Sequence, residues 1–392
     1  MLNSSSPYAF KSDQPWNSRK SPVSLSVQGW LTASILAITR FATAQEALQN
    51  FMADDASAEA RNSRLDSQPY TIRTGDFRLL VASSLGLDWN DNVNTTRENT
   101  EEDFILKPMA HFTASHPISR QNILTFNIGV GYDHYFNHDN YGGFRLQSGS
   151  EISLDISVKD FRVNLHDRFQ YTQDPASQSS VANTARYGGF DNRAGLTVTW
   201  DLQDVLFSLG YDHQNFSSLS REFEYLDRAA ELLVARAGFR VHPTLVLGAE
   251  GSGAFTGYDQ KLLNDSASYS GGVYGDWHPG LKFKVQPRFG YVLYDFDQTS
   301  RSVQAVDQDS WYADLTASHQ FSDVMSYSFS VGHELRLGIQ SDSVEAWYFR
   351  PSFTWNLIKN LSLNMYLAYE HGKQGTSNQN AVSDETYDWF GG

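Results

Sequence analysis

Apolar and polar residues alternate along most of this chain, and the alternation is most regular over residues 143–172. From Phe144 to Val158 every second residue is mostly apolar, and the residues between them are polar or Gly. The same pattern returns from Phe161 to Tyr171, after Lys159 and Asp160. A period of two is typical of a β-strand whose faces lie in different environments.

These two runs predict one hairpin with a defined register. If Lys159 and Asp160 form a two-residue turn, Val158 faces Phe161, and Glu151 lies opposite Arg168 on the polar face. Each run has about 12–14 residues, whereas strands of globular proteins usually have about 5–6 and a tilted membrane-spanning strand needs about 9–11. The pattern therefore favours a hairpin of a transmembrane β-barrel.

Similar runs follow one another over the rest of the chain, and together they predict about sixteen strands. The runs cover 76–89, 103–114, 122–136, 144–158, 161–173, 188–200, 205–216, 228–241, 245–256, 268–278, 281–295, 309–321, 325–339, 344–357 and 361–373, and a last one begins at Thr386. The predicted fold is all-β, a transmembrane antiparallel up-and-down barrel. Its last strand is expected to be incomplete, because Thr386–Gly392 is too short to span.

The connections between the runs alternate between tight and long. Tight turns are predicted at 116–119, 159–160, 202–203, 242–244, 278–280, 322–324 and 358–360, and longer polar loops at 174–187, 217–227, 296–308 and 374–385. Outer-membrane barrels have short periplasmic turns and longer extracellular loops. We therefore expect both chain ends on the short-turn, periplasmic side, and no loop folded inward as a constriction.

Composition supports this class and excludes others. The chain has 392 residues, a formal net charge of -15 and no Cys, and its mean hydropathy is -0.44. No run of about 18 apolar residues is present, so membrane-spanning helices are not expected. With no basic block, nucleic acid is excluded as a partner, and without Cys there are no disulfides or thiol chemistry.

The residues before the strands predict export. Arg19 and Lys20 precede a moderately apolar stretch, and Ala42-Thr43-Ala44 offers a small-x-small cleavage site. Residues 1–44 are therefore interpreted as a signal peptide, with a disordered extension as the alternative. Residues 45–75 are interpreted as a periplasmic segment, either disordered or a short plug, and residues 76–392 as the barrel.

One motif resembles a known family. Asp76-Phe77-Arg78 leads to Asp88-Trp89-Asn90-Asp91-Asn92-Val93, and Asp103 to Pro108 follow. With the export signal, this resembles the putative β-barrel porin type 2 family of bacterial outer-membrane proteins, and the strand repetition extends the resemblance over 76–392. The resemblance implies an outer-membrane location, surrounding lipids and the barrel-assembly machinery as a partner during biogenesis. The chain departs from such barrels by ending at Gly392 without a terminal aromatic residue.

Catalytic and metal-binding motifs do not emerge from the sequence. P-loop, G-x-S-x-G, H-E-x-x-H and dinucleotide-binding patterns are absent, so we expect no enzyme and no cofactor. Asn90-Asp91-Asn92 with Glu98, Glu101, Glu102 and Asp103 could attract Ca²⁺. The preferred interpretation is a solvated acidic loop.

Charged residues on the polar parity, near mid-height, are the candidate pore lining. They are Glu151, Arg168, Arg193, Asp212, Arg236, Glu250, Arg288, Asp314 and Arg350. Facing lipid, each Arg would cost about 2–4 kcal/mol near the midplane, so this parity is predicted to face the lumen. The set is either a salt-bridge lattice that stiffens the wall or a mixed-charge belt that sets the field of a pore.

Together these features predict a porin-like channel for passive diffusion of small hydrophilic solutes. Two alternatives stay open: an accessory barrel for polysaccharide export, and a non-conducting structural or adhesive barrel. Any narrowing of the bore is expected from wall side chains or from the 45–75 segment.

Overall fold

The computed structural model of the chain describes residues 44–62, 70–90, 93–94, 99–119, 121–172, 188–219, 221–300, 305–337, 343–358, 361–378 and 381–391. The proposed signal peptide, residues 1–44, lies outside these residues except for Ala44. The loop at 174–187 and, in the acidic loop, Asp91, Asn92 and Glu98 also lie outside them. Within them, no helix is long and apolar enough to cross a membrane.

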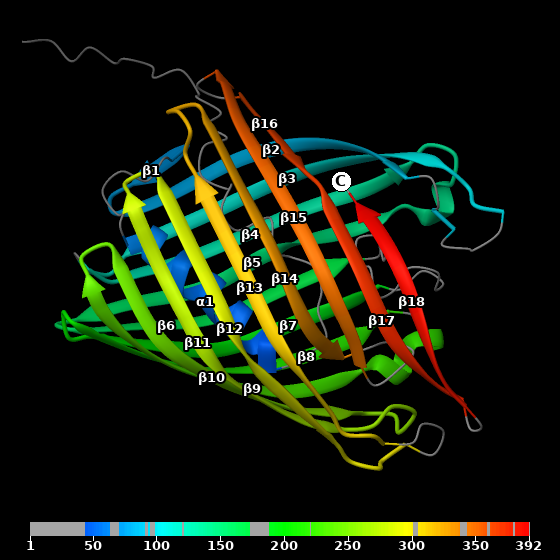
Figure 1. Ribbon diagram of the computed structural model, residues 1–392. Coiled ribbons are helices and arrows are strands. Elements are labelled where there is room, and N and C mark those ends of the chain that lie inside the picture. The colour runs from blue at the N-terminus through cyan, green and yellow to red at the C-terminus, as the bar shows by residue number, and fades with distance from the viewer. Residues whose placement is uncertain are drawn as a thin grey trace, which may run out of the picture.

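The described chain consists of one α-helix, two short 3-10 helices and a long series of strands (Figure 1). The helices are α1 (Ala44–Asn62), η1 (Asp139–Tyr141) and η4 (Arg221–Leu226). The strands are β1 (Ile72–Thr74), β2 (Phe77–Asn90), β3 (Asp103–Pro117), β4 (Ile123–Tyr135), β5 (Gly143–Val158), β6 (Phe161–Thr172), β7 (Gly189–Asp201), β8 (Val205–Ser218), β9 (Arg228–His242), β10 (Leu245–Tyr258), β11 (Ser266–Gly280), β12 (Phe283–Phe296), β13 (Gln308–His319), β14 (Met325–Leu337), β15 (Ser343–Ile358), β16 (Leu361–Tyr366), β17 (Ala368–Asn378) and β18 (Ala381–Gly391).

All strands belong to one antiparallel sheet that is curled into a barrel (Figure 1). β16 and β17 both pair with β15, so they are two halves of one strand interrupted at Leu367. Counting these halves once and leaving out the short β1, the described sheet has sixteen strands. The predicted all-β fold with consecutive antiparallel strands is confirmed.

The hairpin that the sequence predicts between β5 and β6 has the expected register. Val158 pairs with Phe161, and Glu151 pairs with Arg168. Lys159 in the turn has a φ of 53°, a positive value that suits the tight turns compatible with strand twist. The boundaries of most strands lie within a few residues of the predicted ones.

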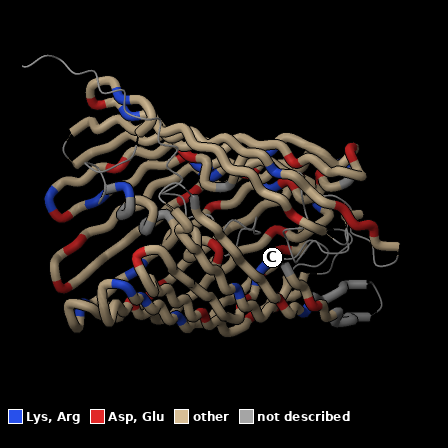
Figure 2. Tube along the Cα trace, turned by 90° about the horizontal axis from the view of Figure 1, so that it is seen from above, with Lys and Arg blue, Asp and Glu red and all other residues tan. Residues whose placement is uncertain are grey.

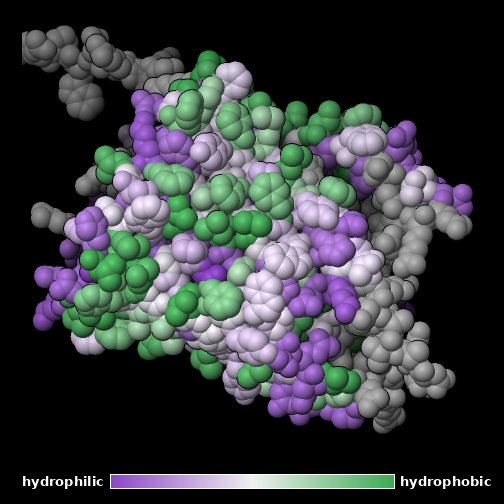
Figure 3. Space-filling model, in the orientation of Figure 1, coloured by the Kyte–Doolittle hydropathy of each residue, from purple (hydrophilic) through white to green (hydrophobic). Residues whose placement is uncertain are grey.

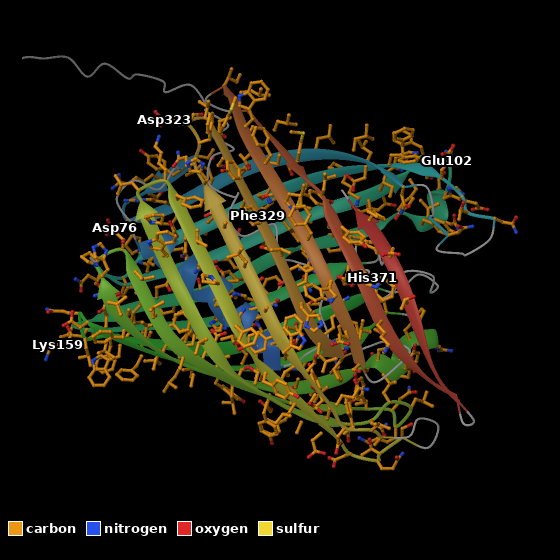
Figure 4. The ribbon with its side chains drawn as sticks, viewed as in Figure 1. Asp76, Glu102, Lys159, Asp323, Phe329 and His371 are labelled. Atoms are coloured by element: carbon orange, nitrogen blue, oxygen red, sulfur yellow. The ribbon has the colours of Figure 1, made fainter. Side chains whose placement is uncertain are left out.

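Short turns gather at one rim of the barrel. Figure 4 shows Asp76, Lys159 and Asp323 at this rim, whereas Glu102 lies at the opposite one. Strands such as β2 and β12 end at the opposite rim, where the longer connections begin. Longer connections lie where predicted at 217–227 and 296–308, whereas the expected loop at 374–385 is mostly strand.

Apolar side chains face outward and polar side chains face inward. On β5, Ile152 is 45% exposed, whereas Glu151 is 7% and Asp155 is 0% exposed. Figure 3 shows apolar side chains spread over the outer wall. Figure 2 shows acidic and basic residues interspersed along the strands and rims. An apolar outside and a charged inside are what a lipid-embedded barrel requires.

The last two strands differ from the sequence-based boundaries. The expected loop at 374–385 is mostly strand, because β17 continues to Asn378 and β18 begins at Ala381, before Thr386. β18 pairs with β17 from Asn378 down to Ala368, so it runs along β17 and ends short of β16. Polar residues fill both parities of this hairpin, so the sequence shows no alternation there.

Helix α1 lies inside the curve of the sheet (Figure 1) and contacts β7, β9, β10, β11 and β14. Its sequence is rich in Ala, Gln and Glu, which favour helices, with Glu46 in the first turn and Arg61 in the last. Most of the helix thus lies in the segment 45–75, for which the sequence predicts either disorder or a short plug.

Candidate functional site

The nine charged residues proposed to line the pore all lie on the inward-facing parity of nine strands. Glu151, Asp212, Glu250, Arg288 and Arg350 are less than 9% exposed. Register pairs connect several members across strands: Glu151 with Arg168, Arg168 with Arg193, Arg236 with Glu250, and Arg288 with Asp314. The structure therefore arranges them around the interior, and their pore-lining role stays a prediction.

Glu250 is the most heavily bonded acid of this set. Its carboxylate accepts a hydrogen bond from Nε of Arg288 at 2.8 Å and lies 3.5 Å from Nε of Arg236. The Tyr312 hydroxyl donates to the same carboxylate at 3.2 Å. Two arginines therefore flank one buried acid, with Asp314 opposite Arg288 as a second acid, and these contacts join β9, β10, β12 and β13.

Tyrosines on the inner wall extend this network, and the sequence analysis missed them. The Tyr348 hydroxyl donates to Asp314 at 2.6 Å, and the Tyr312 and Tyr348 rings press against glycines of neighbouring strands. A methyl group built on Gly290 would lie 2.5 Å from Tyr312, and one on Gly332 2.6 Å from Tyr348. Tyr on the inward parity opposite Gly is the sequence signal that could have revealed this packing.

A second ion cluster joins β14, β15 and β17. Nη1 of Arg336 donates to Glu334 at 3.0 Å, and Arg336 also bonds Glu370. Nη2 of Arg350 reaches the same Glu370 carboxylate at 3.4 Å. Of these four residues, the sequence analysis included Arg350 alone, because the others lie above the mid-height that it used as its criterion.

The half of the interior near the longer loops, the side that we expect to be extracellular, contains an apolar cluster. Phe223 and Leu226 of η4 are buried against inward-facing side chains of β12 such as Val292 and Tyr294. The expectation that no loop folds inward is therefore wrong for the connection between β8 and β9. Charged residues surround Phe223 and Leu226 in the sequence, and this masked their apolar character.

Helix α1 docks on the inner wall through a small apolar face. Ala47, Leu48 and Phe51 pack with Ala230, Leu232, Val234 and Ala254 of β9 and β10. The Phe51 ring also fills the space above Gly210 on β8, where a methyl group would lie 2.5 Å from Cδ2 of the ring. A glycine on the inward parity thus leaves room for the helix.

Arg61 fixes the C-terminal end of α1 to β5. Its Nη1 donates to Glu151 at 2.6 Å, and its Nε donates to Asp155 at 2.7 Å. Hydrogen bonds between ionised partners are among the stronger ones. Neither Arg61 nor Asp155 was among the predicted site residues, because the partners are far apart in the sequence.

The N-terminal end of α1 is bonded to the extracellular half of β14. Oε1 of Gln45 accepts the backbone N–H of Leu335 at 3.0 Å, and Nε2 of Gln49 donates to Glu334 at 3.2 Å. On the other side, the backbone N–H of Ala44 donates to Ser268 of β11 at 2.9 Å. The helix is therefore held at both ends and in the middle.

The acidic loop between β2 and β3 is bonded to the neighbouring connection between β4 and β5. Asp103 accepts the backbone N–H of Asn137 at 2.9 Å and bonds Nδ1 of His138 at 2.9 Å. Nε2 of His138 lies 2.9 Å from Glu101. These acids raise the pKa of His138 above its usual 6.5, chiefly through the hydrogen bond to Asp103. Among the described residues, no group of His, Asp or Glu is arranged to hold a metal ion.

Comparisons with known proteins agree with a barrel. The chain matches the family described as "Putative beta-barrel porin 2" over residues 67–285, more than half of its length. No curated protein matches this sequence.

Several solved outer-membrane structures are similar in outline. OccAB3 of Acinetobacter baumannii is 9% identical, with 81% of this chain and 100% of that chain covered and a TM-score of 0.39. The trimer form of OmpT of Vibrio cholerae is 9% identical, with 80% and 98% covered and a TM-score of 0.38. A "Bacterial polysaccharide outer membrane secretin" is 10% identical, with 79% and 96% covered and a TM-score of 0.38. Structural similarity at these TM-scores and identities does not indicate a function.

Proposed function

Since this chain belongs to the "Putative beta-barrel porin 2" family, we propose that it is a porin-like channel for passive diffusion of small hydrophilic solutes. The chain lies in the bacterial outer membrane and crosses it many times with strands. On this proposal it is a channel and not an enzyme, its outer wall is in contact with membrane lipids, and the barrel-assembly machinery inserts it.

The observation that carries the proposal is the inward-facing belt of charges of both signs. The belt has five arginines and four carboxylates, on nine different strands. Hydrophilic solutes need a path along which they can exchange water for polar groups, and rings of charged side chains supply such paths in channels. A salt-bridge lattice that only stiffens the wall is the alternative use of the same charges.

The bore is narrowed by α1 and by the apolar cluster below η4. About sixteen strands enclose enough space for water unless something fills it, and here a helix of 19 residues stands inside. We propose that solutes pass beside α1 at a low rate and that displacement of α1 widens the path.

Liposome swelling tests this function. Purified protein is reconstituted into liposomes, and swelling is followed in isotonic solutions of sugars of graded size. We expect swelling with small sugars and a decline with size, whereas lipid-only liposomes do not swell. Blockage only by long polysaccharides would favour polymer export instead. No swelling from correctly folded protein would favour a structural barrel.

A further inference from the structure

We propose that α1 is a releasable plug and that the extracellular half of β14 moves with it, leaving β13 when the plug binds and pairing with β13 again when the plug is released. The inference deepens the proposed channel function and rests on it. The contacts at the two ends of α1 support this proposal.

The contact at the C-terminal end of α1 is built to be exchanged. Arg61 binds Glu151 and Asp155, and each of these acids also has a partner on the wall. Nε of Arg168 donates to Glu151 at 3.0 Å, and Nδ2 of Asn164 donates to Asp155 at 2.6 Å. When Arg61 leaves, both carboxylates therefore keep a hydrogen-bond donor in the barrel.

The ladder between β13 and β14 is shorter than the strands that form it. It runs from His319 paired with Tyr327 to Ala313 paired with His333, although β13 begins at Gln308 and β14 continues to Leu337. In contrast, the ladder between β14 and β15 continues to Leu337. The extracellular half of β14 has therefore kept one neighbour and left the other.

This half of β14 lies inward of the line between β13 and β15. Every residue from Gly332 to Leu337 is buried, whereas wall strands elsewhere alternate. Side chains of β13 and β15 meet across it: the Ser310 hydroxyl donates to Glu345 at 2.8 Å, and the rings of Trp311 and Trp347 are 5.4 Å apart. The buried His333 ring is stacked on Trp311, with 4.1 Å between the ring centroids, and lies 4.8 Å from Trp347.

Two residues beyond the last pair, Ala313 with His333, a continued ladder would pair Trp311 with Leu335, and side chains cap both residues instead. Nδ1 of His333 lies 2.9 Å from the Trp311 carbonyl oxygen, which can only accept a hydrogen bond. The Leu335 N–H donates to Oε1 of Gln45 on the plug. Buried backbone groups need partners. When Gln45 leaves, the Leu335 N–H loses its acceptor, and the nearest replacement is the carbonyl oxygen of Trp311, its partner in a continued ladder. Plug release and re-pairing of β14 are coupled in this way.

Thiol labelling tests the release of the plug without measuring transport. The chain has no native Cys. Leu48→Cys therefore introduces a single thiol on the face of α1 that packs against the wall, at a side chain that is 0% exposed. We expect Arg61→Gln to increase its rate of labelling by a water-soluble maleimide about tenfold or more, because labelling follows the open population. Arg73→Gln, at an exposed arginine of β1, is the matched background and should leave the rate unchanged.

A second pair of thiols tests the movement of β14. Extension of the ladder would bring Asp309 opposite Leu337, so Asp309→Cys with Leu337→Cys should form a disulfide readily in the Arg61→Gln background and slowly in the parent. A single Ile105→Cys, buried on β3 in a separate cluster with Val93 and Tyr135, should label at one slow rate in both backgrounds and so reports general loosening.

Faster labelling of Leu48→Cys together with faster disulfide formation supports the proposal. Unchanged labelling overturns it, and so does faster labelling without the disulfide, or equal acceleration at Ile105→Cys. None of these measurements requires conduction, so a barrel that proves not to transport solutes would contradict the proposed function and leave this test intact.

Discussion

His138 is a titratable side chain of the extracellular rim whose surroundings define its behaviour. The hydrogen bond to Asp103 raises its pKa above 6.5, so the protonated form is favoured in the folded loop. The stabilisation is fully present below about 6.5, the unfolded value, and is lost as pH rises through the raised folded pKa. We predict that Asp103→Asn lowers the pKa of His138, measured by NMR titration. Glu101→Gln should lower it less, and an unchanged pKa in Asp103→Asn would contradict the assignment.

Gly210 lies directly against Phe51 of the plug, so that even a methyl group at this position would disturb the packing. Gly210→Ala places a carbon 2.5 Å from the Phe51 ring, and overpacking of this kind costs about 1–3 kcal/mol. We predict weaker docking of α1 and faster labelling of Leu48→Cys. Gly257→Ala on β10 is the matched control, because nothing lies within 4 Å of its added carbon. Equal rates for the two variants would show that Phe51 is not held there.

Glu250 stabilises the wall between two arginines. Removal of one member of a buried ion pair typically costs about 3–5 kcal/mol, because the remaining charge stays buried. We predict a loss of this order in the free energy of unfolding for Glu250→Gln, measured by urea titration in detergent. Glu231→Gln, at an exposed acid of the outer wall that is 44% accessible, should change stability little. Similar free energies of unfolding for both variants would contradict this, because they would mean that the two arginines and Tyr312 do not need the negative charge of Glu250.

At the scale of elements, the sequence predicts strands well wherever one face is in lipid and the other in water. The β5–β6 hairpin illustrates this, since Glu151 and Arg168 face each other as the alternation requires. The signal disappears where both faces are wet, so the β17–β18 hairpin near Asn378 was interpreted as a loop.

The site was predictable only in part, for a related physical reason. The nine charged residues of the inner wall could be predicted from the face of the strand on which each lies and from its distance along the strand from the short turns. The position of α1 depends on contacts such as Arg61 with Asp155, which join residues far apart in the chain. Nothing in the alternation from Gly332 to Leu337 indicates that β14 leaves β13, because that departure depends on Gln45 and His333.

For the whole molecule, the near balance of charges on the inner wall predicts weak ion selectivity. Arg168→Ala with Arg236→Ala removes two cations, so the reversal potential across a salt gradient should shift toward cation selectivity, and high salt should reduce the shift. Some loss of stability should accompany it. The loss is limited, because Glu151 keeps Arg61 and Glu250 keeps Arg288. Strong selectivity in the parent, or no shift in the double variant, would return the belt to a structural role.

Single-channel recording in planar bilayers tests the central claim most directly, that the barrel is a solute channel narrowed by α1. The full chain is compared with a variant that carries Phe51→Ala and Arg61→Gln, which weakens two of the contacts that hold the plug. We predict small conductance steps from the parent, larger and longer openings from the variant, and weak selectivity in both. The absence of conductance from both proteins, each shown to be folded in the bilayer, would contradict the account.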